Sequence, residues 1–397
     1  MVPQTPPTAA AVRQQRPPPW RDVRVLRVVL QVVFAIAVVA LLWFLASNLL
    51  TNLRSAGLPT GFDYLGRPHG TDIRDSDFRP SQAVRAAIIV ALVNTVRVAS
   101  VGILLASVLG LLIGLARLST NWLVRRAAAA YVELLRNVPV LVIIIFMYVA
   151  VILRLPPISR PIEAVGAFVF SNRGLAVPWG ESEDGAGGFT LVLLGALVVA
   201  LAVAWWRTRR NERTGQPHHR FLWGLGVFAG VAALGYIVLG APVALTVPTR
   251  DGRVVAGGIN LGPEYSAVLI GLVIYTASHI AEITRGSILA VPKGQSEAAN
   301  AVALSGFQRL RYVVLPQALR VAVPPVANQY LNLTKNSSLA VFVGYFELTR
   351  ITGQIIANGN PAPQSIAVLM ACYLALSLAI SAVANLFNRS LALKGRT

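Results

Sequence analysis

Long apolar runs, separated by short polar segments, occupy most of this chain. Eight of them approach the roughly 20 residues that a helix needs to cross a bilayer. They cover residues 28–50, 86–116, 127–152, 189–206, 221–240, 265–288, 325–346 and 365–388. The pattern predicts an all-α integral membrane protein with about eight transmembrane helices.

The seventh run is less apolar than the others. It contains the polar residues Asn328, Gln329, Asn332, Lys335 and Asn336. Asn328, Asn332 and Lys335 stand at i, i+4 and i+7, so a helix places them on one face. Such a face does not point at lipid, because nothing there satisfies its polar groups.

The charges support this map of spans. Only 13% of the residues are charged, about half of the share usual in soluble proteins. With the N-terminus inside, the cytosolic segments hold 21 basic and three acidic residues, and the outer segments hold 11 of each. Inner loops are rich in Lys and Arg, so both termini are predicted to be cytosolic, which also requires the seventh span. The net charge of +19 therefore indicates membrane orientation and no nucleic-acid partner.

The ends of the chain and its metal-binding residue types add little. Residues 1–27 are rich in Pro, Gln and Arg, and we predict a disordered, basic cytosolic tail. Cys372 is the single cysteine, and the four histidines show no ligand spacing, so no metal site is expected.

A cytosolic loop precedes the seventh run, at residues 291–322. Its pattern predicts a short helix from about Gln295, a stop at Gly306, a second helix and a break at Pro316, with Pro324 and Pro325 opening the seventh helix. Small residues follow one face of the first helix: Ala298, Ala299, Val302 and Ala303. A short helix with such a face suits a groove on a partner protein.

This loop resembles the coupling loop of ABC importer permeases. The residues that carry the resemblance are Glu297, Ala298, Ala299, Val313, Leu315 and Pro316. Ala303 stands where the family has Gly, and Gly306 is expected to supply the turn instead. The resemblance implies that the loop transmits ATP-driven movement from a separate ATPase subunit to the membrane helices.

Other stretches narrow the resemblance. Residues 131–141, 281–295 and 328–340 look like polar amino-acid uptake permeases, and residues 60–70 and 94–100 look like general, broad-specificity L-amino-acid permeases. This implies a type I importer core of five helices at 86–152 and 265–388, with an added helix at 28–50 and an inserted pair at 189–240. It also implies a bacterial inner membrane location, a periplasmic amino-acid-binding protein and a second, homologous permease subunit in a heterodimer.

The chain has no G-x-x-x-x-G-K-[ST] phosphate loop, so it is not expected to be an enzyme or to bind a cofactor. ATP would be used by the partner. The main alternative is a secondary transporter driven by an ion gradient, although we find no internal repeat of the kind that such folds show. A third interpretation is an anchor that docks a soluble partner, which would not require a polar seventh helix.

Ionisable residues within the spans each require an explanation, because charge in a bilayer is costly. Glu133 and Arg136 are expected to form an ion pair, and His279 and Glu282 to make structural hydrogen bonds. Arg97 either extends to the headgroups or receives a substrate carboxylate.

Two explanations fit the polar face of the seventh helix. One is hydrogen bonding between helices, and the other is a substrate path. An amino acid is a zwitterion, so Lys335 would meet its carboxylate, and the amide oxygens of Gln329 and Asn332 its ammonium group.

Overall fold

The computed structural model describes residues 18, 20, 22–55, 57, 60–182, 186–214, 219–240, 243–252 and 254–391. Most of the predicted tail lies outside these residues. Helix α1 (Val23–Ser55) already begins within the stretch predicted to be disordered. Among the described residues, five helices are long and apolar enough to cross a membrane, or up to seven if each of two bent pairs counts as one span. Residues 222–238, in α6, form a shorter apolar helix.

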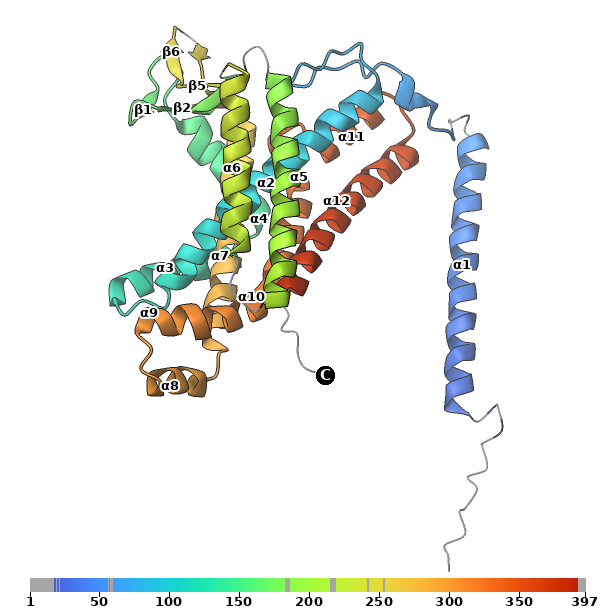
Figure 1. The fold of residues 1–397 in the computed structure, drawn as a ribbon. Coiled ribbons are helices and arrows are strands. Elements are labelled where there is room, and N and C mark those ends of the chain that lie inside the picture. The colour runs from blue at the N-terminus through green and yellow to red at the C-terminus, as the bar shows by residue number, and fades with distance from the viewer. Residues whose placement is uncertain are drawn as a thin grey trace, which may run out of the picture.

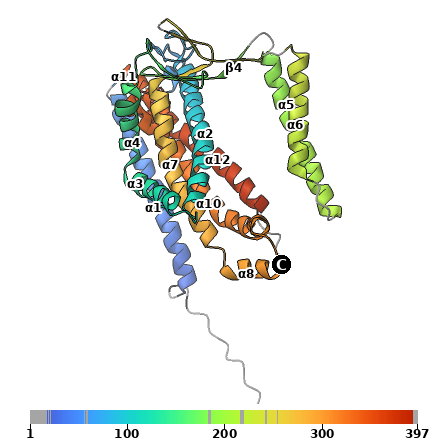
Figure 2. The same ribbon diagram turned by 90° about the vertical axis from the view of Figure 1, so that its left-hand side faces the viewer.

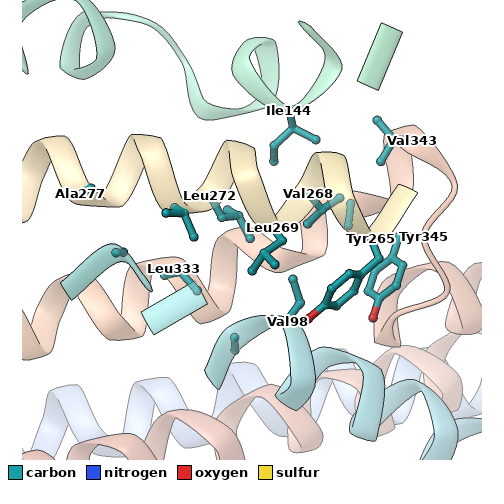
Figure 3. Packing of buried hydrophobic residues seen from close by; sticks show 14 of the residues in the cluster. Val98, Ile144, Tyr265, Val268, Leu269, Leu272, Ala277, Leu333, Val343 and Tyr345 are labelled. Atoms are coloured by element: carbon teal, nitrogen blue, oxygen red, sulfur yellow. The ribbon is translucent and has the colours of Figure 1, made fainter. Parts of the chain in front are cut away.

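Four long helices make up most of the bundle (Figure 1). They are α2 (Val84–Ala116), α7 (Pro263–Leu289), α10 (Leu315–Asn336) and α12 (Ala362–Leu391). Helices α2 and α7 pack along most of their length, and α10 contacts α2, α7 and α12. Figure 3 shows the core between α2, α7 and α10, where Leu269 and Leu272 of α7 face Val98 of α2 and Leu333 of α10.

Small residues bring α2 and α7 together. Ala106, Gly110 and Gly114 recur every fourth residue on the buried face of α2. A Cβ atom added at Gly110 would lie 2.7 Å from the Cβ of Ile280, and one at Gly114 would lie 2.6 Å from the Cβ of Thr284. The two backbones therefore approach too closely for larger side chains, as is common between membrane helices.

The third predicted span, 127–152, is not one straight helix. Helix α3 (Trp122–Asn137) is followed by α4 (Val140–Phe146), and the pair is bent by 105°. Proline at 139 lacks a backbone N–H and holds the preceding residue, Val138, in an extended conformation with φ −99°. The helix cannot continue through this point.

The seventh predicted span, 325–346, also differs from the expectation. Helix α10 starts at Leu315, so Pro324 and Pro325 lie inside it and do not open it. A 3₁₀ segment, η5 (Ser337–Val343), and then α11 (Leu348–Ala357) follow, with a bend of 48°. Packing against α7 and α12 holds α10 together despite the two missing N–H groups.

Short antiparallel strands gather at one end of the bundle, which we call the strand end (Figure 1). One sheet has the order β1 (Ile162–Ala164), β2 (Phe168–Ser171), β3 (Gly174–Val177), β8 (Ile259–Leu261). Two ribbons pair β4 (Trp179–Ser182) with β5 (Val243–Thr246) and β6 (Thr249–Asp251) with β7 (Val254–Ala256). The opposite end, which we call the loop end, carries α8 (Lys293–Ala301).

Three apolar helices stand apart from the bundle. Helices α5 (Ala186–Thr214) and α6 (Arg220–Val238) pack chiefly on each other, and Figure 2 shows this hairpin beside the bundle. Helix α1 is separate in Figure 1, and its most apolar window is 0% buried. Their exposed Leu, Val, Phe and Trp side chains require lipid or another protein chain as neighbours.

Candidate coupling loop and polar path

The predicted loop forms two helical arms at the loop end of the bundle (Figure 1). The first arm is α8, and the second runs through α9 (Gly306–Arg309) and a π-helical turn, η4 (Leu310–Val314), into α10. Arg309 Nη1 donates to Asn300 Oδ1 at 2.7 Å, and Gln317 Nε2 donates to Gln295 Oε1 at 3.2 Å. These two hydrogen bonds join the arms, so they can move as one unit.

The turn between the arms corrects the prediction. Ala303 itself adopts the left-handed conformation, with φ +57°, and Gly306 is the first residue of α9 instead of the stop of α8. Ser305 caps α9 in a reciprocal capping box with Gln308. No break occurs at Pro316: the π-helical turn η4 leads directly into the first turn of α10, which contains this proline.

The exposed surface of the loop also differs from the prediction. Ala299 is only 4% exposed and packs within the chain, so the small residues do not form one docking face. Glu297 and Ala298 are exposed. Three large apolar side chains are exposed beside them, at 69% for Val302, 69% for Phe307 and 64% for Tyr312. Sequence reasoning had passed over Phe307 and Tyr312 because they fall outside the small-residue face.

The polar stripe of α10 points away from the chain's own core. Asn328, Asn332 and Lys335 are exposed, and Gln329 and Asn336 are half-buried. No hydrogen bond or ion pair involves the side chains of these five within the part of the chain that the structure describes. The stripe therefore does not bind helices of its own chain there.

Contacts inside the bundle come from the other faces of α10. Leu333 and Thr334 are buried, and the hydroxyl groups of Tyr330 and Ser107 of α2 are hydrogen-bonded at 2.8 Å. The exposed stripe therefore has no hydrogen-bonding partner within the described part of this chain.

Arg97 does not join the stripe. Its guanidinium carbon lies 5.0 Å from the centre of the Tyr265 ring, and it lines a pocket at the strand end together with Asp75, Asn94 and Glu264. The side chain thus faces a protein pocket at the strand end.

Glu282 forms ion pairs with three arginines at the loop-end side of the bundle. Its carboxylate forms ion pairs with Arg117, with Arg285 at 2.8 Å and with Arg136 at 3.9 Å. The expected pairing of Arg136 with Glu133 is therefore wrong, because the fold brings α3 beside α7. His279 makes the expected type of contact, with its Nδ1 atom 3.1 Å from the carbonyl oxygen of Tyr275. In the described residues, no three His, Cys, Asp or Glu side chains cluster as metal ligands.

Comparison with known proteins decides the class. Residues 102–393 match the sequence model of the family described as binding-protein-dependent transport system inner membrane component. The chain belongs to this family. Membership supports an importer of this kind over a secondary transporter.

Relatives of this inner membrane component align over nearly its whole length. It is 38% identical over 371 residues, 92% of each chain, to the general L-amino acid transport system permease protein AapQ of Rhizobium johnstonii. It is 38% identical to the putative amino-acid ABC transporter permease protein YhdX of Escherichia coli, covering 92% of this chain and 94% of that one. It is 35% identical to the glutamate/glutamine/aspartate/asparagine transport system permease protein BztB of Rhodobacter capsulatus, covering 94% and 96%.

Sequence reasoning missed several residues that shape this inner membrane component. The capping box of Ser305 and Gln308 could have been predicted, because these residues form an S-x-x-Q pattern. The Asn300–Arg309 contact was not, since it depends on how the two arms fold back on each other. The same is true of Asp75 and Glu264, which only the tertiary fold brings to Arg97.

Proposed function

We propose that this chain is the permease subunit of a bacterial ABC importer for L-amino acids. The observation that carries the proposal is a two-armed loop that contains the Glu-Ala-Ala sequence and projects from the helix bundle. The chain is also 38% identical to a general L-amino acid permease over 92% of each chain. ATP is bound and hydrolysed by a separate subunit, and this chain binds no cofactor.

The loop receives the force of ATP binding. Its exposed Val302, Phe307 and Tyr312 offer apolar area to a groove on the ATPase, and Glu297 offers a charge. The second arm runs into α10 without a break, so a push on the loop displaces the helix that carries the polar stripe.

The stripe of α10 faces a second, homologous permease subunit, and the solute passes between the two. Lys335 meets the carboxylate of the amino acid, and the amides of Gln329 and Asn332 meet its ammonium group. All L-amino acids share these two groups, so recognition does not depend on the side chain of the substrate. Asn328 and Asn336 border the same path. The added helices favour a heterodimer. The family's description as binding-protein-dependent favours delivery of the solute by a periplasmic amino-acid-binding protein.

Orientation follows from the charges. We place the strand end in the periplasm and α8, with both termini, in the cytosol of the cell. Single cysteines in a Cys372→Ser background test this. An impermeant thiol reagent added outside cells is expected to label cysteine at Asp77 or Val254 and not at Ala301. Labelling at Ala301 alone would reverse the topology.

The coupling role is tested by Glu297→Lys. We expect Glu297→Lys to abolish amino-acid uptake and to weaken pull-down of the ATPase, because the new positive charge replaces the negative charge that the ATPase surface would contact. Membrane insertion is expected to be normal. Glu163→Lys, the same change at an exposed residue of the strand end, serves as the control and is expected to transport normally. Unchanged uptake and ATPase binding in Glu297→Lys would reject the role, and uptake driven by an ion gradient without ATP would reject the importer.

The path is tested by Lys335→Met. The variant is expected to assemble with its partners and hydrolyse ATP, but to lose uptake of neutral and acidic amino acids together, and Lys335→Arg is expected to retain part of it. Normal transport by the Met variant would show that Lys335 is off the path. Failure to assemble would show that the stripe only joins subunits.

A further inference from the structure

A second polar site lies at the strand end, away from the α10 stripe. Four charged side chains line it, Arg74, Asp75, Arg97 and Glu264. They come from three places in the chain: the segment before α2, α2 itself and the first turn of α7. Residues 344–346, which join η5 to α11, form another wall.

Arg97 is held in position without a carboxylate. Tyr265, which stacks on its guanidinium, is only 5% exposed and lies 5.6 Å, between ring centres, from Tyr345. The Tyr345 hydroxyl donates to the carbonyl oxygen of Asn94 at 3.2 Å, and Asn94 Nδ2 donates to the carbonyl oxygen of Phe346 at 2.8 Å. Within the described residues, no carboxylate lies within 4.0 Å of Arg97. The wall thus presents an oriented cation that lacks an anion.

The two acidic residues of the site differ in their ion pairing. Glu264 is already paired, with its Oε1 atom 3.7 Å from Arg74 Nη1. Asp75 has no ion pair among the described residues, and its backbone adopts φ +57°. A Cβ atom added at Gly262 would lie 2.7 Å from Asp75 Oδ2, so the carboxylate packs directly against the backbone at the start of α7. Asp75, which is exposed, is therefore the anion of the site that lacks a cation.

We propose that this pocket is an entrance site for the substrate, where Arg97 binds the α-carboxylate and Asp75 the α-ammonium group of an amino acid. The inference rests on the proposed function and extends it to a second site, with a defined ligand class. Two guanidinium groups and two carboxylates make the site neutral overall, so one free charge of each sign matches a zwitterion. Neither group contacts the substrate's side chain, which suits a broad range of amino acids.

The site is closed in this conformation. Its free volume is about 20 Å³, which holds about one water molecule and no amino acid. The wall that carries Tyr345 and Phe346 begins at Gly344, whose φ of +87° is readily adopted only by glycine. A transporter closes its outer side while its inner side is open, so a closed entrance agrees with one state of the transport cycle.

The test uses the complete importer in proteoliposomes, with its binding protein and radiolabelled L-glutamate as the probe. Uptake and ATP hydrolysis stimulated by the binding protein are measured together. We expect Arg97→Met and Asp75→Asn each to lower the glutamate imported per ATP by about tenfold, the loss typical of one charged contact, while stimulated ATPase activity is kept. Arg97→Lys is expected to recover part of the uptake.

Arg79→Met is the matched control, because Arg79 is an exposed arginine in the same segment before α2 and does not line the pocket. It is expected to leave import per ATP unchanged. If Arg97→Met lowers uptake and ATPase activity in parallel, Arg97 only stabilises the helix bundle and the inference is wrong. Normal import by both Arg97→Met and Asp75→Asn also overturns it. If the wild-type importer hydrolyses ATP without importing any amino acid, the proposed function itself fails.

Discussion

Ala303 shows how one residue shapes the two-armed loop. The left-handed conformation brings Cβ close to the following carbonyl oxygen, at a cost of roughly 1–2 kcal/mol for a residue other than glycine. The arms need this turn, because the backbone N–H of Ala303 donates to the carbonyl oxygen of Asn300 and α9 then starts at Gly306. The family resemblance places a glycine at this position. The structure shows that Ala303 itself adopts the left-handed conformation, whereas Gly306 is the first residue of α9.

Ala303→Gly is therefore expected to stabilise the loop by about 1 kcal/mol, since glycine adopts φ +57° without the clash. Amide hydrogen exchange in α8 is expected to slow by about fivefold. Ala301→Gly, inside α8, is the control and is expected to speed exchange, because glycine weakens a helix. Faster exchange in Ala303→Gly would show that the turn is not strained.

His69 lies 2% exposed in the segment that precedes α2. Its ring packs edge-on against Phe78 at 5.7 Å, and its carbonyl oxygen accepts a hydrogen bond from Asn358 at 2.8 Å. Burial lowers the pKa of His69, so the folded protein holds the ring neutral. The unfolded chain takes up a proton more readily.

Stability is therefore expected to be full above about pH 6.5, the pKa of an unperturbed histidine, and to fall as the pH drops below it. Thermal unfolding of the purified protein between about pH 5 and 8 measures this. His69→Phe keeps the ring contact and is expected to flatten the pH dependence, whereas the exposed His219→Phe is not. An unchanged profile in His69→Phe would assign the effect to another group.

At the scale of the element, the contact between α2 and α7 depends on the absence of side chains. Ala106, Gly110 and Gly114 let the two helices touch along their loop-end halves. In lipid, apolar side chains gain little by leaving their surroundings, so close backbone packing supplies much of the association.

Gly110→Leu is expected to destabilise the protein by about 3 kcal/mol, because the first added carbon already meets Ile280 at 2.7 Å. A lowered unfolding temperature in detergent measures the loss. Gly195→Leu on α5 is the matched control, since no atom lies within 4 Å of a Cβ added there. Equal effects of the two changes would show that α2 and α7 have room to separate.

At the scale of the molecule, the chain is a bundle with appended helices. The hairpin of α5 and α6 leaves the bundle through β4 and returns through β5, where Ser182 pairs with Val243. The hairpin as a whole starts and ends at the strand end, so removing it is expected to leave the topology of the rest unchanged.

Replacing residues 183–242 by Asn-Gly, which favours a two-residue turn between paired strands, is expected to leave a bundle that inserts and unfolds at the original temperature. Unfolding in detergent and labelling of cysteine at Asp77 measure this. The control replaces the hairpin with the same turn and also carries Gly110→Leu, which is expected to unfold earlier. A shortened chain that aggregates would show that the hairpin is part of the core.

The sequence by itself determined where apolar helices lie, that two helical arms join α7 to α10 and that α10 has a polar face. These features depend on neighbouring residues, because hydropathy and helical periodicity act over a few turns. The bend at Pro139 was equally local, but the apolar run concealed it.

Only the tertiary structure decided which distant residues meet. Arg136 pairs with Glu282 and not with its neighbour Glu133, and Arg97 lies against Tyr265 in a pocket that Asp75 also lines. Such contacts depend on how α2, α3 and α7 cross, and the packing of their small and large side chains sets that angle. No pattern within a single helix carries this information.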